Sequence, residues 1–112
     1  MKDSEKKLID IRNTLKEIGK VDMNSVRKFR DFMNSVKVEG ALSTKIKELI
    51  GVAVSISRHC EFCVPLHVKQ ALEHGATKEE IIEASMIAGL LGGGPSVIFI
   101  KYVFDALNTF QK

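Results

Sequence analysis

Hydrophobic residues recur every three or four positions along the first third of the chain, which is the spacing of one helix face. One such stripe runs from Leu8 to Ile18 and reaches Gly19, a residue that commonly ends a helix. A second stripe follows Asp22, runs from residue 26 to 36 and ends before Gly40. The pattern predicts two helices in this part of the chain.

The remaining two thirds are also helical in pattern. Ser43 is placed to cap a largely apolar helix over 44–57, and a segment over 61–73 carries Pro65, which a helix accepts only in its first turn. Residues 77–80 form a capping-box sequence before a fifth helix, and a last helix begins at Pro95 or Ser96. β-Branched residues at 52–56 and 97–100 leave a short strand as the alternative there. We predict an all-α fold of about six helices in one domain, residues 1–112.

Composition restricts the classes of function. The chain has 112 residues, 45% hydrophobic and 28% charged, with a formal net charge of +3 from interspersed acidic and basic residues. This balance does not indicate a nucleic-acid partner. The start of the chain lacks the apolar run of a signal peptide, and the apolar stretch 81–100 is interrupted by Gly92-Gly-Gly-Pro95 and by Glu83, so no membrane span is predicted. We expect a cytoplasmic protein.

The candidate chemistry lies in Cys60-Glu-Phe-Cys63 and in His67, one helical turn further on. At the N-terminal end of a helix, unpaired N–H groups and the helix dipole stabilise a thiolate. Two cysteines at this spacing can close a disulfide, with one attacking and the other resolving. His67 is placed to accept a proton from Cys63 or to pair with its thiolate. This pattern predicts a catalytic redox site.

Two further interpretations remain open from the residues alone. Glu48 is the lone acid of an apolar helix after its cap, so it either lies near water beside a lysine or points inward and serves proton transfer. The cysteine pair and His67, with Glu48 or His59, could also supply four zinc ligands. The sequence offers no second pair of zinc ligands with the usual spacing, so we expect no bound metal.

Glu48, eleven intervening residues, the cysteine pair, three more residues and His67 together resemble the signature of the alkylhydroperoxidase D-like group. That group belongs to the carboxymuconolactone decarboxylase family. Similar flanks occur at residues 40–50 and 74–81, and the resemblance covers roughly residues 26–107. It implies an all-α fold and a homo-oligomer, usually a trimer or a hexamer. The decarboxylase branch lacks the cysteine pair, so decarboxylation is not expected.

The resemblance also implies a peroxidase cycle without a bound cofactor. In that cycle Cys63 meets a small hydroperoxide, Cys60 resolves the sulfenic acid as a disulfide, and His67 and Glu48 form the proton relay. The helix dipole alone would favour Cys60 as the nucleophile. Phe62 stands where full-length relatives have a histidine, which leaves the reductant, a dithiol or a lipoyl-type partner, open. An oligomeric redox sensor without turnover is the non-enzymatic alternative.

Overall fold

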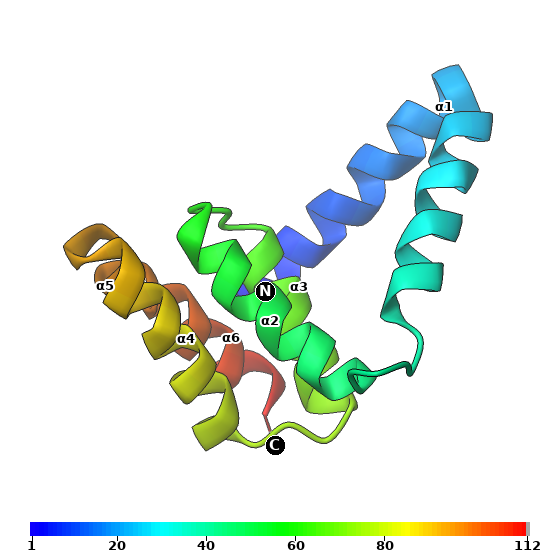
Figure 1. Ribbon diagram of the computed structural model, residues 1–112. Helices are drawn as coiled ribbons and strands as arrows, with labels where there is room; N and C mark the ends of the chain where they lie inside the picture. Colours follow the sequence, from blue (N-terminus) through cyan, green and yellow to red (C-terminus); the bar gives the residue numbers. More distant parts are fainter. Residues whose placement is uncertain (112) are drawn as a thin grey trace.

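The computed structural model describes residues 1–111, which form six helices and no strand (Figure 1). In chain order they are α1 (Asp3–Lys37), α2 (Thr44–Ser57), α3 (Cys63–Glu73), α4 (Lys78–Gly92), α5 (Gly94–Phe99) and α6 (Lys101–Phe110). The predicted all-α fold is confirmed, and the β-branched segments at 52–56 and 97–100 are helical rather than extended.

The first two predicted helices are the two halves of α1, which bends at Asp22 (φ −150°, ψ 78°) instead of ending at Gly19. A glycine inside a helix costs only about 1 kcal/mol, which is too little to end a helix on its own. The Asp22 carboxylate accepts hydrogen bonds from the backbone N–H and the hydroxyl of Ser25, at 3.0 and 2.6 Å, and so caps the second half. In Figure 1 the two halves form an inverted V, and the second half returns the chain to the start of α2.

The core lies where α2 and α3 pack against each other and against α4 and α6. Fully buried aliphatic side chains come from each of these helices, among them Val52, Ile56, Val68, Ile81 and Val103. Burying such a side chain contributes about 1.5–3 kcal/mol relative to leaving it exposed. This packing fixes the α2–α3 pair, and that pair carries most of the candidate site.

Local signals set several helix ends. Ser43 caps α2 by accepting the N–H of Ile46, and Thr77 and Glu80 form both bonds of the predicted capping box at the start of α4. The predicted last helix is divided at Ile100. There the N–H of Ile100 bonds to the Val97 carbonyl at 3.2 Å, a tighter turn than an α-helix makes. The count of six therefore takes α1 as one helix bent at Asp22 and the C-terminal segment as two helices.

Within residues 1–111, none of the helices combines the length and apolar character that crossing a membrane requires.

Candidate functional site

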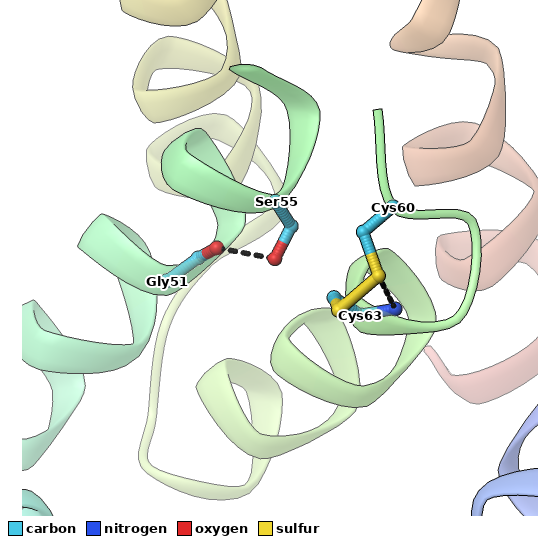
Figure 2. Close-up of a disulfide and its surroundings, with 4 residues drawn as sticks. All are labelled: Gly51, Ser55, Cys60 and Cys63. Carbon is cyan, nitrogen blue, oxygen red and sulfur yellow. Dashed lines mark hydrogen bonds between the residues drawn. A yellow bond between two sulfur atoms is a disulfide. The ribbon is translucent and has the colours of Figure 1, made fainter. Parts of the chain in front are cut away.

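The two cysteines are joined as a disulfide between the end of α2 and the start of α3 (Figure 2). Cys63 is the first residue of α3, whereas Cys60 lies in the preceding turn, so the helix begins two residues later than the sequence predicts. The Cys60 N–H donates to the Ser55 carbonyl at 3.0 Å. This bond ties the turn to the last part of α2 and fixes the place of the first sulfur.

The N-terminus of α3 faces the sulfur of Cys60. The backbone N–H of Cys63 donates to Cys60 Sγ over 3.2 Å (Figure 2). Pro65 occupies the third position of the helix, where no intrahelical N–H partner is lost. A thiolate formed here on reduction gains from the helix dipole and from unpaired N–H groups. The predicted placement of the pair at a helix start is confirmed.

Glu48 points inward, which settles the question that the sequence left open. Its side chain, on α2, is only 3% exposed, and its Oε1 lies 2.7 Å from Nδ1 of His67 on α3. An ionised carboxylate only accepts hydrogen bonds, so the tautomer that completes this bond has its proton on Nδ1. The other ring nitrogen, Nε2, is then left to exchange a proton elsewhere. Glu48 and His67 thus form a carboxylate–imidazole pair spanning two helices.

Gly51 provides the space for the imidazole ring. A Cβ atom at this position would lie 2.7 Å from His67 Nδ1, closer than real Cβ contacts, and 3.0 Å from its Cγ, which is also tight. The absence of a side chain one turn after Glu48 therefore lets the ring lie directly against α2. Sequence reasoning missed Gly51, because an isolated glycine in a helix does not reveal what packs on it.

Lys37, the last residue of α1, completes the charge arrangement around Glu48. Its Nζ lies 3.4 Å from Glu48 Oε2 and donates to Gln70 Oε1 at 2.7 Å. Sequence reasoning did not identify Lys37 or Gln70 either. The sole signal would have been a lysine at the end of a helix, which is common, so only the packing of α1 on α2 and α3 reveals it.

A pocket of about 510 Å³ opens beside the disulfide. Both sulfur-bearing residues and His67 line it, and the complete lining is Gly51, Val54, Ser55, Arg58, His59, Cys60, Cys63 and His67. A molecule with a few heavy atoms fits such a space. The structure therefore brings three of the four predicted site residues to one pocket, and Glu48 reaches it through His67.

His59, weighed above as a metal ligand, has another role in the fold. It adopts a left-handed backbone conformation (φ 52°), and its ring packs against Phe99 at a tilt of 35°, with centroids 5.2 Å apart. Among residues 1–111, no group of three or more His, Cys, Asp or Glu side chains is arranged to hold a metal ion. The two sulfurs are bonded to each other.

Comparison with known proteins agrees with this geometry. The sequence model of the carboxymuconolactone decarboxylase family matches residues 24–104. An uncharacterized protein from Cupriavidus necator is 33% identical over 110 residues, covering 96% of this chain and 97% of its own.

Solved structures give the same relationship. The apo form of a carboxymuconolactone decarboxylase family protein from Legionella pneumophila superposes with a TM-score of 0.91 at 28% identity, covering 97% of both chains. Another member, from Thermotoga maritima, gives a TM-score of 0.80 at 28% identity, covering 92% of this chain and 88% of its own. The chain belongs to the carboxymuconolactone decarboxylase family.

Proposed function

We propose that this protein is a thiol oxidoreductase that reduces a small hydroperoxide by cycling Cys60 and Cys63 between dithiol and disulfide. One observation carries the proposal: the disulfide opens onto a pocket that it shares with His67, whose Nδ1 is held by a buried carboxylate. A disulfide that only stabilised the fold would need neither the pocket nor the carboxylate–imidazole pair.

The oxidative half of the cycle starts from the dithiol. His67 Nε2 accepts the proton of Cys63, and the thiolate attacks one oxygen of the hydroperoxide, which breaks the O–O bond. Cys63 becomes a sulfenic acid, and the leaving alkoxide takes the proton back from His67 as an alcohol. Cys60 then attacks the sulfenic sulfur, the disulfide forms, and the hydroxyl leaves as water with the Cys60 proton.

The reductive half requires an external dithiol. That molecule attacks the disulfide through a mixed disulfide and leaves oxidised, restoring both thiols. A dithiol or a lipoyl-type reductant fits this step, and no bound cofactor is needed. The Thermotoga maritima relative is described as a candidate participant in an antioxidative response, which supports the same chemistry. We place the cycle in the cytoplasm, where thiols are kept reduced.

Cys63 is the proposed nucleophile because it lies one helical turn before His67 on α3. The hydrogen bond from the Cys63 N–H to Cys60 Sγ favours the opposite order, since it stabilises charge on Cys60. Replacing each cysteine with serine separates the two orders: Cys63→Ser should stop peroxide consumption, whereas Cys60→Ser should allow a single oxidation to a sulfenic acid.

Turnover distinguishes this enzyme from a redox sensor. With excess dithiothreitol or dihydrolipoamide as reductant, the wild type should consume many equivalents of hydroperoxide per subunit. A single equivalent consumed, followed by a stable disulfide that neither dithiol reduces, would favour the sensor and contradict the enzyme.

We also propose that the protein works as a homo-oligomer, a trimer or a hexamer. Large apolar side chains lie exposed on the second half of α1, on α2 and on α4–α5, and they include Phe29, Phe32, Val36, Ile46, Ile50, Val54, Ile87, Leu90, Leu91 and Ile98. Exposed apolar side chains gathered over neighbouring helices are typical of surfaces that bind another protein chain. Light scattering should give three or six times 12.5 kDa, and the mass of one chain would contradict this proposal.

A further inference from the structure

Glu48 is the most deeply buried charged side chain on the proton path, and it has two charged or polar partners on opposite oxygens. Oε1 meets His67 at 2.7 Å, and Oε2 meets the ammonium of Lys37 at 3.4 Å. Removing a carboxylate from water is costly unless a positive charge or several donors compensate it. Lys37, with 28% of its side chain exposed, is the cation that compensates Glu48.

Contacts that do not involve Glu48 hold Lys37 in place. Its ammonium donates to Gln70 on α3, and its backbone carbonyl accepts the hydroxyl of Thr44 at 2.7 Å. Lys47 donates to the carbonyls of Val36 and Val38, both at 2.7 Å, and so closes the end of α1 onto α2. The junction of α1 with α2 is therefore built to present this one lysine to the carboxylate.

The relay also runs between two separate pockets. Glu48 and Lys37 line a pocket of about 600 Å³ between α1, α2 and α3, whereas His67 lines the disulfide pocket. Lys37 closes the outer end of the relay, on the side away from the sulfurs. Because the Lys37 ammonium holds Oε2 of Glu48, the other carboxylate oxygen, Oε1, stays directed at the His67 ring.

We propose that Lys37 is the positioning residue of the proton relay: by binding Oε2 of Glu48, it keeps Oε1 on Nδ1 of His67 and leaves Nε2 free for the thiol. The orientation of the His67 ring follows from the structure alone, whereas the transfer of a proton between Nε2 and the thiol rests on the proposed function. Lys37 touches neither the substrate pocket nor a sulfur, so it acts entirely through Glu48.

The direct test is the state of the His67 ring, measured by ¹⁵N NMR on histidine-labelled disulfide-form protein. In the neutral ring, the wild type should show Nδ1 protonated and Nε2 unprotonated, with the signals assigned through His67→Asn. In Lys37→Met, which keeps the length and removes the charge, the ring should become a mixture of tautomers. Lys37→Arg should restore the wild-type pattern.

Lys45→Met is the matched control, because Lys45 also pairs a carboxylate across two helices, Glu80 at 3.0 Å, but lies outside the relay. Its His67 signals should equal those of the wild type. If Lys37→Met is folded by circular dichroism and its His67 signals are also unchanged, the positioning role is overturned.

The second readout is the rate at which reduced Cys63 reacts with iodoacetamide. At metal sites, losing the hydrogen-bond partner of a ligating imidazole costs about 10- to 100-fold, and Lys37 acts one residue further from the ring, through Glu48. Lys37→Met should therefore be roughly tenfold slower, with Lys37→Arg within about twofold of the wild type. Adding Lys37→Met to Glu48→Gln should change little, because both act on one path. Fully additive losses would overturn the proposal.

The two readouts separate this inference from the proposed function. If Lys37→Met changes the His67 tautomer but the wild type does not turn over peroxide, Lys37 is still the positioning residue and the proposed peroxidase activity is wrong. If Lys37→Met leaves the His67 tautomer unchanged while the wild type turns over peroxide normally, the role of Lys37 is wrong and the proposed peroxidase activity stands.

Discussion

Glu48→Gln isolates the charge of the buried carboxylate, because glutamine has nearly the same shape. In the wild type one oxygen accepts from His67 at 2.7 Å and the other faces Lys37 at 3.4 Å. In the variant the amide oxygen can still accept from Nδ1, but the amide nitrogen then faces the ammonium, donor against donor. The bond to His67 survives without its charge, and the bond to Lys37 is lost.

The expected loss of stability follows from these two contacts. Changing a charge-assisted hydrogen bond into a neutral one costs about 1 kcal/mol. Leaving Lys37 without its carboxylate costs about 1 kcal/mol more, a reduced value because part of the lysine reaches water and Gln70 still accepts from it. The sum of about 2 kcal/mol should lower Tm by about 8 °C in a chain of this size.

The effect on chemistry should be larger than the effect on folding. Without the carboxylate, an imidazolium at His67 has no anion beside it, so His67 becomes a poorer proton acceptor for Cys63. General acid–base groups contribute about 10²- to 10⁴-fold, and we expect about a 100-fold loss in the alkylation rate of reduced Cys63 and in peroxide turnover. Stopped-flow peroxide consumption and mass spectrometry of the alkylated protein measure the two rates.

Glu83→Gln is the matched control, because Glu83 is an exposed carboxylate on α4 that lines neither the disulfide pocket nor the pocket around Glu48 and Lys37. It should leave both rates and Tm unchanged. If Glu48→Gln is folded and keeps both rates within twofold of the wild type, then the carboxylate does not serve the imidazole and the proposed relay is wrong.

Three other changes test separate parts of the structure. Gly51→Val places side-chain atoms where the His67 ring lies, so Cys63 alkylation should slow about tenfold while circular dichroism stays helical; an unchanged rate would show that the ring has room to move. The backbone N–H of Thr77 and the Lys45 ammonium hold the pKa of Glu80 below its usual 4.5, so its contribution to stability is present above pH 4.5 and is lost as pH falls through the lowered pKa. The Tm difference between wild type and Glu80→Gln should therefore shrink in acid, and a difference independent of pH would contradict this. Leu91→Glu, at a leucine that is 82% exposed, should reduce the mass measured by light scattering; an unchanged mass would remove Leu91 from the interface.

Features that depend on neighbouring residues were predictable from the sequence. Ser43 and the Thr77–Glu80 pair cap their helices as expected, because these hydrogen bonds span three residues and need no distant partner. The Cys60–Cys63 disulfide likewise follows from a spacing that one turn of chain enforces. Local geometry therefore accounts for most of the helix map and for the sulfur pair.

Features that depend on how helices meet were not predictable in the same way. The orientation of Glu48 stayed open until the packing of α3 on α2 placed His67 beside it. Gly51 and Lys37 matter only because of residues on other helices: the His67 ring packs on Gly51, and the Glu48 carboxylate lies beside Lys37. The end expected at Gly19 was wrong because the Asp22 carboxylate, not the glycine, provides the capping bonds at the bend.

The most direct test of the redox cycle is intact mass with thiol trapping, before and after one equivalent of hydroperoxide is added to the reduced protein. The account predicts that the wild type loses two hydrogens and both trappable thiols, and that Cys63→Ser does neither and leaves the peroxide unconsumed. A wild type that keeps both thiols beside intact peroxide would contradict the central claim. Consumption by Cys63→Ser but not by Cys60→Ser would reverse the roles of the two cysteines.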